Sequence, residues 1–268
     1  KGVYGLTVID GSIYEGENGL ITASGVYLNA DGDVGTYNAP IQTSTSTLTA
    51  WAKGNYGYTS GNVYIQNTGD LTLVYNGNDN SANNIYSLNV TNGSIFNGGS
   101  TIYAYETDLH ADHNIGTSGT PISLSTTYLN AWADGGDAYL TNDQAVTIIG
   151  NNYASGTWSL VAQGDITIGE GNSQHGRISA DYAINLEAQN GGGIYDYNAW
   201  YDGYNNYNTL VAPNITLTAD SHIGNWDSGV LAISTNNLVA TSYGGNIDIG
   251  NNWNHNNYTD GINVTLQA

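Results

Sequence analysis

An aromatic and amide-rich segment, residues 195–207, holds the densest group of potential binding residues in this chain of 268 residues. It reads YDYNAWYDGYNNY. Tyr and Trp rings stack on sugar faces, while Asp and Asn side chains hydrogen-bond sugar hydroxyls. The same residue types also form protein–protein contacts, or pack over a neighbouring part of a fold. If the segment binds a ligand or partner, the contact residues are its aromatic ones: Tyr195, Tyr197, Trp200, Tyr201, Tyr204 and Tyr207.

Three short acidic or amide-rich clusters could supply oxygen ligands to Ca²⁺. They are DGD at 31–33, NGNDN at 76–80 and DGGD at 134–137. None has the spacing of an EF-hand loop, and ordinary Asx turns explain the same residues. Both interpretations stay open, and no cofactor other than Ca²⁺ is expected. The metal interpretation assigns the ligands to Asp31, Asp33, Asp134 and Asp137.

The stretch DLHADH at 108–113 brings two histidines and two aspartates together in the sequence. In a β-strand, His110 and Asp112 lie on one face and His113 on the other. This alternation works against a compact metal site. We therefore expect a surface turn here.

Two carboxylate pairs have the i, i+2 spacing that places both groups on one face of a strand. They are Glu15 with Glu17, and Glu106 with Asp108. Paired carboxylates hydrolyse glycosidic bonds, so a polysaccharide-degrading β-helix enzyme is one alternative. Such enzymes combine their carboxylates with Arg or Lys to bind acidic sugars, and this chain has three such residues in all. We predict that the chain is not an enzyme.

The charge balance limits the partners. The formal net charge is −20, and the basic residues are Lys1, Lys53 and Arg177. A field of this sign repels nucleic acid and anionic membranes. No apolar run approaches the length of a transmembrane helix, so we expect no membrane insertion. Cysteine is absent, and stability must come from backbone pairing and packing.

The elements implied by the sequence are short strands. Good helix formers are scarce, while Gly, Asn, Thr, Ser and Tyr dominate. Short runs of alternating apolar and polar residues recur about every 7–10 residues, and turns rich in Gly, Asn and Asp separate them. Examples are the runs 26–30, 48–52 and 63–66. The chain is therefore all-β.

One block of sequence is written twice, at 28–52 and at 109–133, with thirteen identical positions and no gap. A second pair of similar segments, 5–16 and 87–98, has nearly the same offset. This offset of roughly 81 residues predicts a super-repeat of that length. A third copy opens with LTADSHIG at residue 217 and is stretched. We expect one domain, 1–268, with approximate repeats 1–82, 83–180 and 181–268.

Fixed internal repeats favour a solenoid over a β-sandwich, which needs no such repetition. We predict a parallel β-helix of roughly a dozen coils, each about 20 residues long. Single Leu, Ile and Val residues of the strands would form its core. Trp51 and Trp132 hold equivalent places in the two copies of the block and should pack between coils.

The pattern DGDVGT…API…LTA at 31–50, followed by GNVYIQNTGDLTL at 61–73, resembles filamentous-haemagglutinin-type bacterial surface adhesins. GDITIG at 164–169, NITLTA at 214–219 and GGNIDIG at 244–250 extend the resemblance over essentially the whole chain. It implies a right-handed parallel β-helix. It also implies a secreted shaft on or shed from the cell surface, serving adhesion, aggregation or biofilm structure.

These observations together predict a structural extracellular repeat protein, a β-solenoid that forms part of a surface filament or adhesin shaft. Its expected partner is itself, joined head to tail, or flanking repeats of a longer chain. The alternative is a glycan-binding adhesion module that uses residues 195–207 to hold glycans or the surfaces of other cells.

Overall fold

The computed structural model describes residues 2–54, 60–170, 175–198, 209–224, 230–251 and 263–267. The described residues contain no α-helix and fold into short strands. By the contacts between its residues the chain divides into two units, 1–127 with 131–140, and 128–130 with 141–268. This boundary falls in the middle of the chain, and the three expected repeats stay a prediction.

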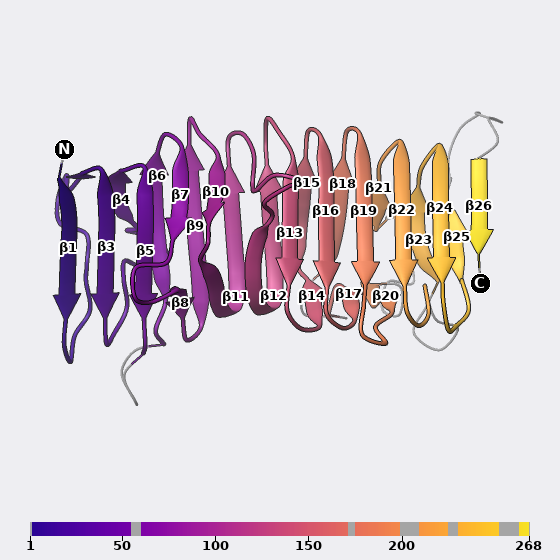
Figure 1. Ribbon diagram of the computed structural model, residues 1–268, viewed down its shortest axis with the longest axis horizontal. Coiled ribbons are helices and arrows are strands. Elements are labelled where there is room, and N and C mark those ends of the chain that lie inside the picture. Colours follow the sequence, from indigo (N-terminus) through magenta and orange to yellow (C-terminus); the bar gives the residue numbers. More distant parts are fainter. Residues whose placement is uncertain are drawn as a thin grey trace. The chain divides into compact units, whose positions relative to one another are not determined.

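The strands of unit 1 follow one another closely along the chain (Figure 1). They are β1 (Val3–Val8), β2 (Ile21–Thr22), β3 (Gly25–Ala30), β4 (Ile41–Ser44), β5 (Thr47–Ala52), β6 (Val63–Thr68), β7 (Leu71–Val74), β8 (Asn80–Ala82), β9 (Ile85–Thr91), β10 (Ile95–Gly98) and β11 (Thr101–Ala111). Two further strands contribute residues to both units, β12 (Ile122–Ala133) and β13 (Ala138–Asn142).

Unit 2 continues in the same manner. Its strands are β14 (Val146–Ile148), β15 (Gly150–Ala154), β16 (Thr157–Ala162), β17 (Ile166–Ile168), β18 (Gly176–Ala180), β19 (Ala183–Ala188), β20 (Ile194–Asp196), β21 (Leu210–Val211), β22 (Asn214–Ala219), β23 (Leu231–Ser234), β24 (Asn237–Ser242), β25 (Ile249–Asn251) and β26 (Asn263–Gln267).

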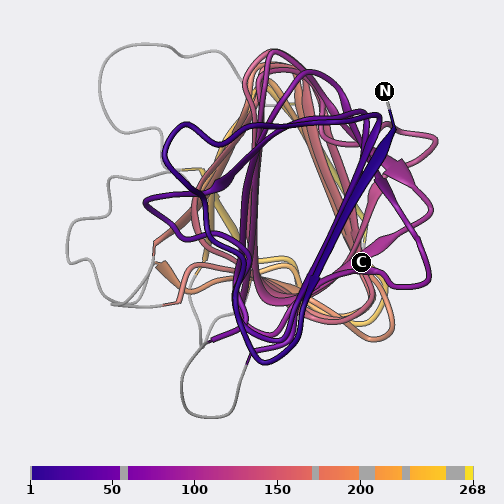
Figure 2. The ribbon, with the colours of Figure 1, turned by 90° about the vertical axis from the view of Figure 1, so that its left-hand side faces the viewer.

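Each strand pairs in parallel with the strand one coil further along the chain. In unit 1, β1 pairs with β3 and β3 with β5. In unit 2, β16 pairs with β19, β19 with β22, and β22 with β24. This is a parallel β-solenoid of about ten turns, which confirms the expected fold class. The coils of each unit overlie one another when the chain is viewed from its end (Figure 2).

The coils are longer and less uniform than the sequence suggested. The register partners Leu231 and Ile249 are joined by a short coil, whereas the coil that joins Ile178 to Leu210 is much longer. Longer coils explain why there are about ten turns and not a dozen. Strand length varies as well, from the two residues of β2 to the twelve of β12.

The core consists of columns of apolar side chains that run from coil to coil. One column in unit 1 joins Ile41, Ile65, Leu88 and Leu109, and all four are buried. Strand alternation produces these columns, because every second side chain of a strand points inward. Burial of one such Leu contributes about 1.5–3 kcal/mol, so the columns hold the coils together.

Most of the inward-facing Leu, Ile and Val residues are buried, and those that keep exposed surface lie in the outermost coils. Leu6 and Val8 of β1 are half-buried, as are Ile247 and Ile249, and Leu266 of β26 is exposed. The described residues place a coil on only one side of β1 and of β26. A side chain with one neighbouring coil keeps part of its surface in water.

The two complete copies of the repeated block fold alike. Each contains a glycine of positive φ, Gly35 or Gly116, and a tight turn follows it. Thr36 and Ala39 exchange two backbone hydrogen bonds of 3.1 Å across the first turn, and Thr117 and Thr120 do the same across the second.

The described part of the chain has no helix of the length and hydrophobicity that a membrane crossing requires.

Candidate functional site

A recurring hydrogen bond fixes the turn that follows three equivalent strands. An aspartate at this turn accepts the backbone N–H of a residue one coil earlier, through its Oδ2 atom. The pairs are Asp31 with Asp10 at 3.0 Å, Asp112 with Asn92 at 2.6 Å, and Asp220 with Gly191 at 3.1 Å. Each pair stands at a left-handed turn, at Asp10, Asn92 or Asn190. The aspartate is therefore part of the repeat's framework.

A second acceptor follows two residues later in each copy. Asp33 Oδ1 accepts the N–H of Asn62 at 2.8 Å, Asn114 Oδ1 that of Asp137 at 2.9 Å, and His222 Nδ1 that of Asn246 at 3.0 Å. Aspartate, asparagine and histidine share the ability to accept a hydrogen bond here. The bonds of Asp31 and Asp33 join different coils, whereas an Asx turn is local. The Asx-turn and calcium interpretations of these two residues therefore both stay predictions.

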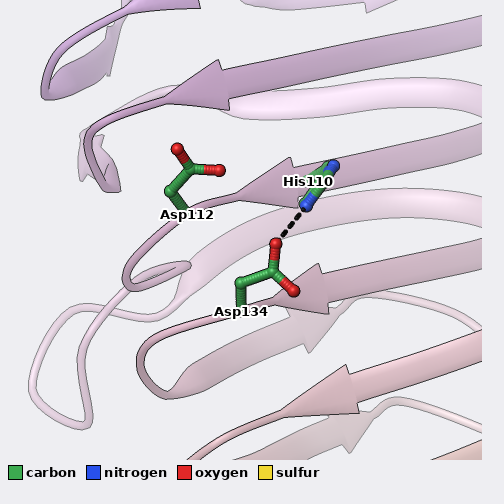
Figure 3. Close-up of side chains that lie close together, drawn as sticks. All are labelled: His110, Asp112 and Asp134. Atoms are coloured by element: carbon green, nitrogen blue, oxygen red, sulfur yellow. Dashed lines mark hydrogen bonds and ion pairs between the residues drawn. The ribbon is translucent and has the colours of Figure 1, made fainter.

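One copy of this turn carries a group of potential metal ligands. His110 is on the outer face of β11, Asp112 follows that strand, and Asp134 follows β12 one coil later. Their ligand atoms all lie within 4.8 Å of one another. His110 Nε2 and Asp134 Oδ2 are 3.0 Å apart and form an ion pair when the imidazole is protonated (Figure 3). We call these three residues the His110 cluster.

Each carboxylate of the His110 cluster is held by another donor. The backbone N–H of Asn92 binds one oxygen of Asp112, as described above. The indole Nε1 of Trp132 donates to Oδ1 of Asp134. This bond and the one to His110 hold the pKa of Asp134 below its ordinary value. Trp132, like its counterpart Trp51, lies half-buried on the outer face of its strand.

Two further acids precede the His110 cluster on the same face of β11. Strand alternation places Glu106, Asp108 and His110 outward, with buried residues between them. Burial raises the pKa of Glu106. Burial, and then the neighbouring Glu106, raise the pKa of Asp108 to about 6. The expected acid pair therefore shares a face, and it adds negative charge beside the His110 cluster.

The structure separates the remaining candidates from the His110 cluster. His113 is exposed and does not belong to it, in agreement with the alternation predicted for this stretch. Asp137 contributes to the turn through its backbone, because its N–H donates to Asn114 Oδ1. In the sequence DLHADH and DGGD are separate clusters, and nothing in their spacing shows that β11 and the end of β12 lie side by side. Only the pairing of coils brings Asp134 to His110.

The aromatic segment is described in part. Tyr195 and Tyr197 lie on the outer side of the solenoid, and Tyr197 is 46% exposed. Between them Asp196 is fully buried and accepts hydrogen bonds from the Thr209 hydroxyl and the Asn198 N–H. Burial raises the pKa of Asp196. Trp200, Tyr201, Tyr204 and Tyr207 lie outside the described residues, so a glycan or partner contact at 195–207 stays a prediction.

Comparisons with protein-family models, with curated proteins and with solved structures find no match to this chain.

Proposed function

We propose that this chain is a structural segment of an extracellular shaft, a fibre or adhesin stalk whose coils join further coils end to end. The partner is a second copy of the chain or flanking repeats of a longer polypeptide. A parallel solenoid suits this role because each coil supplies backbone donors and acceptors to the next. Adding a coil repeats a contact that the fold already makes.

The observation that carries the proposal is the incomplete burial of the core residues in the outermost strand, β1. Leu6 is half-buried, and its register partner Leu28 is buried. Val8 is likewise half-buried next to the buried Ala30. Tyr4, on the same face of β1 as Leu6 and Val8, is 42% exposed. A further coil stacked on β1 would bury all three side chains and pair the strand edge that has no partner among the described residues.

The sequence pattern supports the same role. The resemblance to filamentous-haemagglutinin-type adhesins implies a right-handed helix, secretion and display on the cell surface. The Gly-Asp pairs of that pattern have a structural purpose in this fold. Asp70 and Asp165 each follow a glycine, and each accepts a backbone N–H from the next coil, at 2.9 Å from Ser94 and 2.8 Å from Gly193. Such bonds reinforce coil stacking.

Electron microscopy of the purified chain at increasing concentration tests end-to-end association. We expect filaments or short stacks whose length grows with concentration. Leu6→Asp places a charge in the column that a joining coil must bury, so this variant should remain in single particles.

The matched control is Thr7→Asp, which adds the same charge to the neighbouring, outward-facing residue of β1. This variant should associate like the unmodified chain. Circular dichroism shows whether both variants keep their strands. Single particles at every concentration, or equal association of the two variants, would contradict assembly through the β1 end.

A further inference from the structure

We propose that His110, Asp112 and Asp134 bind one divalent transition-metal ion of the Zn²⁺ class on the outer face of unit 1. This inference is independent of the proposed shaft function. It concerns a site that joins the turn after β11 to the turn after β12, one coil further along the same unit.

The spacing of the ligand atoms suits a common ion. Bonds from Zn²⁺ to histidine nitrogen and carboxylate oxygen are about 2.0–2.2 Å long, so two neighbouring ligands lie about 3–3.5 Å apart. His110 Nε2 and Asp134 Oδ2 are separated by 3.0 Å. The farthest ligand atoms of the three residues lie within 4.8 Å, so small side-chain rotations complete the set. The ion would take the place of the hydrogen bond between His110 Nε2 and Asp134 Oδ2.

The donor types select the class of metal. An imidazole nitrogen with two carboxylate oxygens suits Zn²⁺ and its neighbours in the first transition row, whereas Ca²⁺ and Mg²⁺ prefer oxygen alone. The side chains of His110 and Asp134 are 43% and 50% exposed, which leaves room for water to complete the coordination. The net charge of −20 raises the local concentration of cations.

Both carboxylates are oriented before any ion arrives. The N–H of Asn92 fixes Asp112, and the indole of Trp132 fixes Asp134. Donors of this kind hold first-sphere ligands in place in metal proteins. Asn89, the register partner of His110 on β9, also has a buried side-chain oxygen with no hydrogen-bond partner among the described residues.

The repeat itself shows that this ligand set is not required for folding. The equivalents of His110 in the other copies are Asn29 and Thr218. The equivalents of Asp134 are Lys53 and Tyr243. All three make the same backbone bond, in which the N–H groups of Lys53, Asp134 and Tyr243 donate to the carbonyls of Ala30, Ala111 and Ala219, respectively. The aspartate at 31, 112 and 220 is common to all copies and serves the turn. His110 and Asp134 are particular to the second copy. Together with Asp112, the aspartate that all copies share, they form the group of three potential ligands.

Calorimetric titration of the full chain with Zn²⁺, together with the absorption spectrum of bound Co²⁺, tests the proposal. We expect one saturable site per chain and a rise in the unfolding temperature with Zn²⁺. The double variant His110→Asn/Asp134→Lys installs residues that the fold accepts at the equivalent places of the first copy. It should weaken binding by at least about tenfold and abolish the Co²⁺ ligand-field bands. If the double variant fails to fold, the single variant His110→Asn replaces it and should lose the same Co²⁺ bands.

The control is His113→Asn, which removes the exposed histidine of the same turn and should leave the affinity unchanged. The reverse exchange, Asn29→His/Lys53→Asp, builds the set around Asp31 and should add a second equivalent of bound Zn²⁺. The proposal is overturned by the absence of a saturable site, by equal binding in the double variant, or by a reverse exchange that adds no second equivalent.

Discussion

At the scale of single residues, the unusual abundance of aspartate has a structural explanation. Asp31, Asp33, Asp70 and Asp165 each accept a backbone N–H from a neighbouring coil. A hydrogen bond with a charged acceptor contributes about 1.5–3 kcal/mol, more than a neutral one. Part of the acidity of the chain therefore stabilises the turns between its coils.

Asp196 is a carboxyl that the fold buries completely. This burial raises its pKa above the ordinary value despite the bonds from Thr209 and the Asn198 N–H. A carboxyl with a raised pKa in the folded state binds a proton more readily there than in the unfolded chain. Its contribution to the free energy of unfolding is therefore greatest at low pH and falls as the pH rises through the folded-state pKa.

We expect Asp196→Asn to remove this dependence. The difference in free energy of unfolding between variant and unmodified chain should move in favour of the variant from about pH 4 to about pH 8. Urea unfolding at several pH values measures it. Asp143→Asn, a change at an exposed aspartate, serves as the control and should give a nearly constant difference. A constant difference for Asp196→Asn as well would show that its burial does not shift its proton affinity.

At the scale of the element, the turn after each equivalent strand depends on one glycine. Gly35, Gly116 and Gly224 have φ values of 73°, 67° and 69°. A Cβ atom on Gly116 would lie 2.6 Å from the carbonyl oxygen of Tyr139 in the next coil. Both the backbone angle and the close approach of the neighbouring coil therefore exclude a side chain. The same requirement explains why this glycine is present in all three copies.

Gly116→Ala should lower the free energy of unfolding by at least about 2 kcal/mol, because left-handed strain and a backbone clash add together. Thermal and urea unfolding measure the loss. Gly119→Ala in the same turn is the matched control, since a Cβ there has no atom within 4 Å, and it should change stability by less than about 0.5 kcal/mol. Equal effects of the two changes would mean that the turn adapts without cost.

At the scale of the whole molecule, a net charge of −20 opposes the stacking of coils. Carboxylates on successive coils repel one another, and among the described residues the one carboxylate ion pair, His110 with Asp134, forms only when the imidazole is protonated. At about 0.01 M ionic strength the repulsion extends over about 30 Å, and at about 0.15 M over about 8 Å. Stability should therefore depend on salt.

Raising NaCl from about 0.01 M to about 0.15 M should increase the free energy of unfolding by about 1–2 kcal/mol, seen as an increase of a few degrees in unfolding temperature. Calorimetry in metal-free buffer measures the change without interference from divalent ions. Sucrose of equal osmolality provides the uncharged control. An unchanged or lower unfolding temperature in NaCl would show that hydrogen bonds to the carboxylates already offset the repulsion.

The sequence by itself determined the class of fold and most of the core. Alternating residues can bury one face only as strands, and the copies at 28–52 and 109–133 had to fold alike because they share the glycines and aspartates of one turn. The tertiary structure decided which coils meet. The connections vary in length, so register partners are close in sequence at Leu231 and Ile249 but far apart at Ile178 and Leu210, and no sequence pattern reports that separation. The pairing of His110 with Asp134, and with it the candidate metal site, follows from that register alone.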